Sequence, residues 1–290
     1  MNLSRSPFGG RNFENFGEDP FLTGTMATSY IKGVQSQGVD ACMKHYLAND
    51  METRRFNMDE QIDEQILREL YLQPFQIAPK ADQWTAMTAY PKINGEHADT
   101  SKFLVTDILR EDWGFNGIIM NDWGGLNETV KSIRAGINLE MPSPPISCLA
   151  LLEAVRSGAV SEKDDVDPAV KYLLRTLARS GLLSGLPNGV STQEKTDAEV
   201  NRRIHEAEEP MGKEEFRATA RQVATSGIVL LKNNSGLVPL EPTTIPRLAI
   251  IGLNANSPTT GGTGNAIVNP YYATTPYDSI CEAANHYIRT

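Results

Sequence analysis

The sequence predicts an α/β protein in which helices cover a parallel sheet and a second α/β domain begins further along the chain. Up to about Leu183, short apolar runs of strand length alternate with segments whose apolar residues recur at helical spacing. Short connections between such elements are typical of a parallel sheet covered by helices. After Leu183 the chain becomes rich in Ser, Gly, Pro, Glu and Asn, which indicates a linker before order resumes.

The element pattern predicts the domain boundaries. The first domain is expected over 1–183, with strands at 38–43, 84–89, 117–120 and 133–141 and helices at 59–77, 101–111, 149–156 and 168–180. Asp59 or Asn57 is expected to cap the helix at 59–77. The linker is expected over 184–213. The second domain is expected over 214–290, with a helix at 214–226 and strands at 228–231 and 248–251.

Composition excludes several classes of function. The 290 residues carry a net charge of −9 and no basic stripe, so nucleic acid is not an expected partner. No apolar run approaches the roughly 20 residues that span a membrane, so no membrane partner is expected either. The three cysteines, Cys42, Cys148 and Cys281, form neither a disulfide framework nor a metal motif. Free thiols favour a cytoplasmic protein, and no metal is expected.

Asp122 is the first candidate for a catalytic residue. It follows the apolar run 117–120 and is itself followed by Trp123, Gly124 and Gly125. In barrels of alternating strands and helices, the carboxyl ends of the strands hold the chemistry. A carboxylate beside a large aromatic side chain therefore suggests a sugar site. The alternative is that Asp122 caps the next helix, a role that Asn127 could also fill.

Other polar residues follow the predicted strands in the same way. Lys44 and His45 end the first, Tyr90 ends the second, and Arg11 lies in a glycine-rich segment near the start of the chain. These side chains can donate hydrogen bonds to sugar hydroxyls, and Trp123 offers a flat apolar face to a pyranose ring.

Each of these residues also has a purely structural interpretation. Arg11 could pair with Glu14 or Glu18 to brace its loop. His45 could be a buried histidine of the core, and Tyr90 could be an amphipathic residue at the rim. The set at successive strand ends favours a common site over four separate structural roles.

Several motifs together resemble the family 3 glycoside hydrolases, and among these the β-glucosidases of the fungal, intracellular type. In the first domain they are residues 9–20, 44–46, 53–55, 87–90 with 94–95, and 121–123. Residues 227–233 and 251–255 resemble the start of that family's second domain, and 261–264 through 270–272 resemble a segment shortly after it. The resemblance implies part of a (β/α)8 TIM-type barrel followed by the start of an α/β sandwich domain.

The resemblance also implies roles for individual residues. Asp122 would be the nucleophile, and Trp123 would line the glucose subsite. The hydroxyl-binding residues would be Arg11, Lys44, His45 and Tyr90, and Met87 would lie against the pocket. The implied reaction is hydrolysis of terminal β-D-glucosyl residues from small β-glucosides or cello-oligosaccharides with retention of configuration, without a cofactor or metal. A β-xylosidase activity stays open.

The resemblance leads us to expect a fragment of such a protein. A complete barrel takes roughly 250 residues, whereas the predicted first domain ends at residue 183. No glutamate of the sequence matches the family's general acid/base, which lies in the second domain. One alternative is therefore an inactive remnant that binds sugar weakly or binds a partner, and a homo-oligomer or a complementing chain stays open. The last alternative, a nucleotide-binding protein based on Gly262-Thr263-Gly264, is disfavoured because the fingerprint's third glycine is missing.

Overall fold

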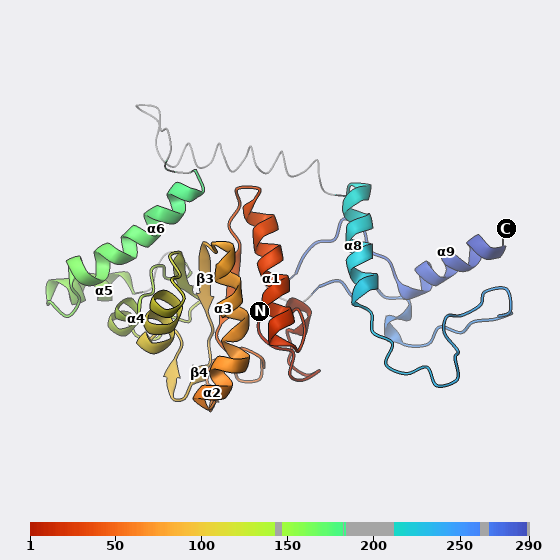
Figure 1. Cartoon of the computed structure of the whole chain (residues 1–290), viewed down its shortest axis with the longest axis horizontal. Helices are drawn as coiled ribbons and strands as arrows, with labels where there is room; N and C mark the ends of the chain where they lie inside the picture. The colour runs from red at the N-terminus through yellow and green to blue at the C-terminus, as the bar shows by residue number, and fades with distance from the viewer. Residues whose placement is uncertain (143–146, 182, 184–211, 262–266, 289–290) are drawn as a thin grey trace. The chain divides into compact units, whose positions relative to one another are not determined.

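The computed structural model describes residues 1–142, 147–181, 183, 212–261 and 267–288 (Figure 1). The chain divides into two compact units, Met1–Asn188 and Gly189–Thr290, called unit 1 and unit 2 below. Most of the predicted linker and the glycines at 262–264 lie outside the described residues. The predicted domain boundaries therefore stay predictions, and each unit is described separately.

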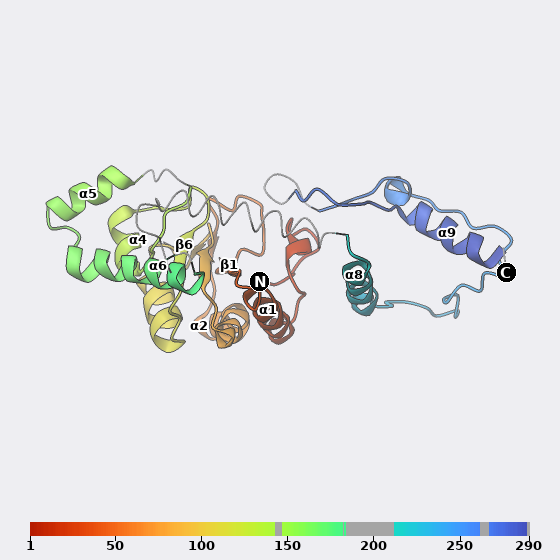
Figure 2. The ribbon, with the colours of Figure 1, turned by 90° about the horizontal axis from the view of Figure 1, so that it is seen from above.

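A three-stranded parallel sheet forms the centre of unit 1. Its strands β1 (Cys42–Tyr46), β3 (Thr85–Thr88) and β6 (Ile118–Asn121) lie in the order β1-β3-β6. In both Figure 1 and Figure 2, the labelled strands of this sheet lie between α1 and α4. Because parallel strands place their carboxyl ends at one edge, the polar residues that end them meet there. The first strand lies later than predicted, so Lys44 and His45 are inside β1 rather than after it.

Helix α1 (Pro20–Gln35) packs closely on the segment that precedes β3. Asp19 caps α1 by accepting a hydrogen bond from the Leu22 N–H at 2.6 Å, and Pro20 occupies the first turn. A Cβ at Gly24 would lie 2.9 Å from the Ile77 side chain, so a glycine is needed for this close approach to α3 (Gln73–Ile77). The short helix η3 (Ala78–Ala81) then leads to β3.

The predicted helix at 59–77 is shorter than expected. Asp59 and Glu60 form β2, which pairs in parallel with β4 (Lys92–Ile93), and β4 pairs with β5 (Glu96–His97). The helix begins only at α2 (Glu64–Ile66) and continues through η2 (Leu67–Tyr71). Neither Asp59 nor Asn57 is its cap. Asp63 caps it by accepting from the Gln65 N–H, whereas Asp59 accepts from the Gly95 N–H.

The predicted strand at 133–141 is wrong. Its first residues belong to helix α4 (Thr129–Ala135), and only Leu139 forms a single parallel bridge, to Met120. The Asn138 side chain explains the difference, because its Oδ1 accepts the Ile119 N–H at 2.9 Å, in the place of a backbone carbonyl. Three predicted helices of unit 1 agree with the structure to within two residues: η4 (Phe103–Asp112), α5 (Cys148–Arg156) and α6 (Asp167–Arg179). Helix α1 and η5 (Glu162–Val166), which precedes α6, have no predicted counterpart.

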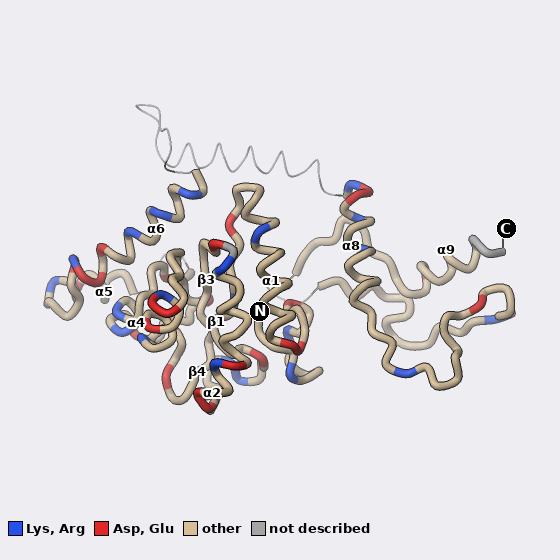
Figure 3. Tube along the Cα trace, viewed as in Figure 1, with Lys and Arg blue, Asp and Glu red and all other residues tan. Residues whose placement is uncertain are grey.

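The core of unit 1 surrounds Tyr46 at the end of β1. Its side chain is fully buried and meets the Phe75 ring edge-on, with ring centroids 5.2 Å apart. The phenol hydroxyl donates to the Leu104 carbonyl at 2.8 Å, so the polar tip of this core residue is satisfied. Outside the core, acidic and basic residues are interspersed along the chain (Figure 3).

Unit 2 contains α8 (Glu214–Gly227), η6 (Leu253–Ala255) and α9 (Pro276–Ile288). The strands predicted at 228–231 and 248–251 are wrong, because neither segment forms a strand within residues 212–261 and 267–288. Both segments are mostly exposed, and Leu231 and Ile251 are 92% and 91% exposed. Among the helices of both units, within the part of the chain that the structure describes, none is long and apolar enough to cross a membrane.

Candidate active site

Asp122 lies directly after β6 at the carboxyl edge of the sheet. Its side chain is 13% exposed, and its Oδ1 accepts the Trp123 N–H at 2.7 Å. The Asp122 carbonyl accepts the Gly125 N–H at 2.7 Å, which closes a tight turn, and Gly124 has the positive φ of 70° that such a turn favours. Asp122 is not the cap of the next helix, because α4 begins only at Thr129.

Asn121 fixes the base of this turn. It is fully buried, and its Nδ2 donates to the carbonyls of Asp122 at 2.7 Å and Met141 at 2.8 Å. Its Oδ1 accepts the Met141 N–H at 3.0 Å. The amide therefore joins the end of β6 to the segment around residue 141, a function that requires both a donor and an acceptor.

His45 lies against the Asp122 carboxylate. Its Nε2 is 3.3 Å from Asp122 Oδ2, and its side chain is 7% exposed. Burial, followed by the positive charges of Arg11 and Lys44, lowers the pKa of His45 to about 2. The imidazole is consequently neutral at physiological pH, so it offers polarity to the site without a charge. His45 is buried, as the structural interpretation required, but it contacts the candidate nucleophile.

Tyr90 connects the neighbouring strand end to the same turn. Its hydroxyl donates to the Trp123 carbonyl at 2.9 Å. Burial, with the negative charge of Asp122, raises the pKa of Tyr90 to about 12, so the phenol stays protonated at neutral pH. The Tyr90 ring is 4.5 Å from the Phe56 ring, and the Arg55 guanidinium lies 4.7 Å from the Tyr90 ring centroid.

Arg11 braces its loop, as its structural interpretation anticipated. Its guanidinium pairs with Glu14 at 2.7 Å and lies 3.9 Å from Glu52. These contacts leave its side chain 22% exposed. Two acidic residues therefore hold Arg11, and its side chain stays partly exposed.

The other three predicted site residues differ in exposure. Met87 is buried within β3, between the strands of His45 and Asp122. Lys44 is exposed on β1, and Trp123 is 47% exposed. An indole that is half exposed beside a carboxylate leaves a flat apolar surface available to a ligand.

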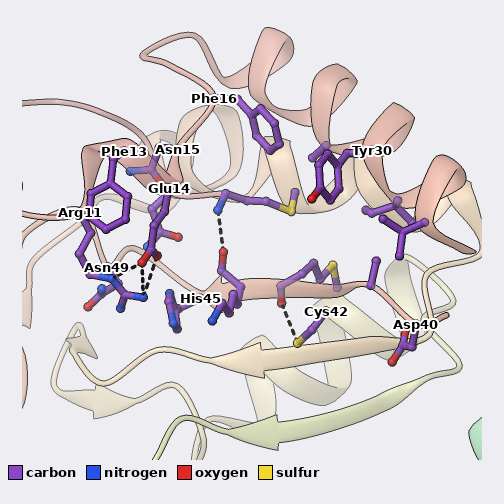
Figure 4. A pocket seen from close by; sticks show the side chains of 18 residues that line it. Arg11, Phe13, Glu14, Asn15, Phe16, Tyr30, Asp40, Cys42, His45 and Asn49 are labelled. Carbon is purple, nitrogen blue, oxygen red and sulfur yellow. Dashed lines mark hydrogen bonds and ion pairs between the residues drawn. The ribbon is translucent and has the colours of Figure 1, made fainter. Parts of the chain in front are cut away.

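A cavity of about 610 Å³ adjoins one side of this group (Figure 4). Arg11, Lys44 and His45 line it, together with residues of the first segment of the chain, of α1 and of β1. Figure 4 shows Phe16 and Tyr30 across the cavity from Cys42. Asp122, Tyr90 and Trp123 are not among the residues that line it, so the cavity contacts the candidate site only through the first three side chains.

Two further charged residues contact the candidate site residues, and the sequence did not single them out. Glu52 accepts from Asn49 Nδ2 at 2.8 Å and from Arg55 at 2.6 Å, and it lies near Arg11. Arg55 in turn packs on Tyr90. Arg55 lies in the motif at 53–55, so the sequence did contain a feature that could have identified it. Glu52 becomes recognisable only when the fold brings the segments around 11 and 52 together.

The arrangement combines a carboxylate, a neutral imidazole, a protonated phenol, two arginines and an exposed indole. Such groups can bind sugar hydroxyls, and an aspartate can act as a nucleophile at a sugar carbon. Within the described residues, no group of three or more His, Cys, Asp or Glu is arranged to hold a metal ion. The fold and site thus define an α/β protein suited to sugar chemistry.

Comparison with known proteins identifies the family. Residues 1–176 match the glycosyl hydrolase family 3 N terminal domain, and residues 228–287 match the glycosyl hydrolase family 3 C-terminal domain. The chain therefore belongs to glycosyl hydrolase family 3, which confirms the resemblance seen in the sequence.

The chain is similar to β-glucosidases of fungi and bacteria. It is 42% identical over 283 residues to beta-glucosidase B of Emericella nidulans, with 96% of this chain and 31% of that protein covered. It is 38% identical over 284 residues to thermostable beta-glucosidase B of Acetivibrio thermocellus, with 97% and 34% covered. The chain spans about a third of the length of these curated relatives.

Solved structures show the same fold. The β-glucosidase of Kluyveromyces marxianus in complex with glucose matches with a TM-score of 0.80 and 34% identity, covering 98% of this chain and 33% of that one. Beta-glucosidase 3B of Thermotoga neapolitana in complex with glucose matches with a TM-score of 0.78 and 32% identity, covering 100% and 40%. An α/β fold of this family is thereby shown.

Proposed function

We propose that this chain carries the glucose-binding and nucleophilic half of a retaining β-glucosidase, with Asp122 as the nucleophile. The observation that carries the proposal is the grouping of His45, Tyr90 and Trp123 around the Asp122 carboxylate at one edge of the parallel sheet. The family and the glucose complexes of similar proteins support glucose as the sugar. The substrates would be small β-glucosides or cello-oligosaccharides.

The proposed reaction begins with attack of an Asp122 carboxylate oxygen on C1 of the sugar. The new bond is a glycosyl ester, and the C1–O bond to the aglycone breaks with its electron pair on the leaving oxygen. A general acid must supply a proton to that oxygen, which is typically worth 10²- to 10⁴-fold in rate. Water then hydrolyses the ester, so the configuration at C1 is retained.

The neighbours of Asp122 suit this reaction. A neutral His45 offers a polar hydrogen and a protonated Tyr90 offers its hydroxyl oxygen, both without adding charge, and the pKa shifts keep them in these forms across the neutral range. Trp123 would stack on the sugar ring, while Arg11 and Lys44 would reach hydroxyls from the cavity side. Met87 would support the pocket from β3.

We also propose that β1, β3 and β6 are successive strands of a (β/α)8 barrel. Their parallel order in the sheet follows their order in the sequence, helices separate them, and the candidate site lies at their carboxyl ends. An experimental structure with these strands in a flat sheet that has helices on both faces would contradict this part of the proposal.

A cytoplasmic location completes the proposal. The three cysteines are free, and Cys42 and Cys148 are exposed, which suits a reducing compartment. Fractionation of cells of the source organism tests this point, and recovery of the protein in the secreted fraction would contradict it.

The decisive experiment is covalent trapping of Asp122. The purified chain is incubated with 2,4-dinitrophenyl 2-deoxy-2-fluoro-β-D-glucoside and analysed by intact mass and peptide mapping. Dinitrophenolate leaves without a proton, so the experiment needs no general acid. The expected result is a single 2-fluoroglucosyl adduct on the peptide that contains Asp122.

Two controls make the result specific. Asp122→Asn, which keeps the size of the side chain, should show no adduct, and the matching 2-fluoroxyloside should label the wild type more slowly. Faster labelling by the xyloside would favour a β-xylosidase. A folded chain that gives no adduct with either reagent would instead support a remnant that binds sugar weakly or binds a partner.

A further inference from the structure

Asp99 is a fully buried carboxylate that the proposed reaction does not use. It follows β5 and is 0% exposed. Three donors contact it: the Asn127 N–H at 2.8 Å, Asn127 Nδ2 at 2.7 Å and the Ser132 hydroxyl at 2.7 Å. All three donors are neutral groups. Burying a carboxylate is costly unless its oxygens are hydrogen-bonded, so these contacts determine whether the charge is tolerated.

The contacts of Asp99 lead back to the candidate nucleophile. Asn127 Nδ2 also donates to the Gly125 carbonyl at 3.1 Å, and the Gly125 N–H donates to the Asp122 carbonyl. One continuous series of hydrogen bonds therefore runs from Asp99 through Asn127 and Gly125 to Asp122. Ser132 extends the series into α4.

The segment around Asp99 also contacts the other side of the site. His97 Nδ1 lies 3.0 Å from the Tyr90 carbonyl, and the His97 carbonyl accepts the N–H groups of Thr100 and Ser101, both at 3.1 Å. The turn at 97–101 is thus joined to Tyr90 at one end and, through Asp99, to the loop 122–127. The Tyr90 hydroxyl in turn donates a hydrogen bond to the Trp123 carbonyl.

We propose that Asp99 is a positioning residue that fixes the loop 122–127 and so sets the orientation of Trp123 beside Asp122. Asp99 acts through Asn127 and does not contact the sugar. Its kinetic consequence rests on the proposed function, whereas its effect on Trp123 does not.

The test uses the 290-residue chain with 5-fluorotryptophan in place of Trp84, Trp113 and Trp123, observed by ¹⁹F NMR. Trp123→Phe assigns the resonance of Trp123. In Asp99→Asn, an NH2 group replaces the oxygen that accepts from Asn127 Nδ2, so two donors face each other, that hydrogen bond is lost and the loop is loosened. The Trp123 resonance should shift or broaden, while those of Trp84 and Trp113 stay in place. A general loss of stability would affect all three tryptophan resonances, and not that of Trp123 alone.

A reciprocal change provides the rescue. In Asp99→Asn with Asn127→Asp, the amide of residue 99 donates to the new carboxylate, and its oxygen still accepts the residue 127 N–H. The Trp123 resonance should move part of the way back, because the contact between residues 99 and 127 is restored but a carboxylate at residue 127 cannot donate to the Gly125 carbonyl. Asn127→Ala removes the amide that contacts both Asp99 and the Gly125 carbonyl but keeps the residue 127 N–H. It should give a shift of the same kind, which keeps the proposal testable if Asp99→Asn does not fold.

The control is Asp165→Asn, because Asp165 accepts the Ser161 N–H at 2.8 Å and lies 3.8 Å from Arg134, near the other end of α4. It should leave the Trp123 resonance unchanged. In the trapping experiment, Asp99→Asn should label Asp122 about tenfold more slowly, since small displacements of reacting groups are costly, and Asp165→Asn should label at the wild-type rate.

The two proposals fail separately. An unlabelled wild type would contradict the proposed function, while the NMR experiment would still decide the role of Asp99. A Trp123 resonance that is unchanged in both Asp99→Asn and Asn127→Ala, or a shift equal to that of Asp165→Asn, would overturn the positioning role.

Discussion

Apolar segments of similar length behave differently in the two units. In unit 1, residues 118–121 form β6, and Ile119 is fully buried between neighbouring strands and helices. In unit 2, residues 228–231 and 248–251 carry comparable apolar runs, yet Leu231 and Ile251 are almost fully exposed. The difference shows that an apolar run becomes a strand only where a second strand and a covering layer satisfy its backbone and side chains.

Hydrogen exchange offers the largest measurable contrast between these segments. Amides of 118–121 should exchange about a thousandfold or more slowly than their intrinsic rates, because they open only with the unfolding of the sheet. Amides of 228–231 should exchange near their intrinsic rates. Mass spectrometry with peptic digestion measures both in one experiment. Strong protection at 228–231 would show that this segment is paired in solution and would remove the contrast.

Truncating one large apolar side chain in each unit should have unequal effects. Phe75→Ala should lower the free energy of unfolding by about 3–5 kcal/mol, because Phe75 is 1% exposed and packs on Tyr46. Leu231→Ala should change it by less than about 0.5 kcal/mol. Urea titration followed by circular dichroism measures both. Equal losses would mean that Leu231 packs in a core.

The acid sensitivity of unit 1 should be traceable to His45. Its pKa is about 2 when folded and 6.5 ordinarily, so the unfolded chain binds the extra proton. Stability from the neutral form is complete above pH 6.5 and is lost as the pH falls below it, by up to about 1.4 kcal/mol per pH unit. Urea unfolding between pH 7.5 and 4.5 should show a steeper decline for the wild type than for His45→Asn. Parallel curves for the two proteins would contradict the neutral, buried state of His45.

Much of the candidate site could be assembled from the sequence because its residues follow visible strands. Asp122, Trp123 and Tyr90 directly follow apolar runs, and parallel strands bring such ends together. Glu52 could not be predicted, because its importance arises from Arg11 and Arg55, which the fold brings to it. Sequence periodicity could not show that pairing.

The errors in the fold have equally specific causes. Asp59 and Glu60 continue a helical pattern, but pairing with residues 92–93 draws them into a small sheet. Residues 133–141 are apolar enough for a strand, but Asn138 replaces the backbone as the acceptor for Ile119. In both cases a contact distant in sequence overrides a local preference.

The absence of a side chain at Gly125 has a consequence for motion. A Cβ there would lie 3.0 Å from Cδ1 and Cε1 of Tyr90, so the backbone of the loop lies directly against that ring. The same ring also contacts Phe56 and Arg55. We therefore expect a half-turn of the Tyr90 ring about its own axis to require movement of these neighbours. The rate of ring flipping at Tyr90 would then report how often the contact between this ring and the loop 122–127 opens.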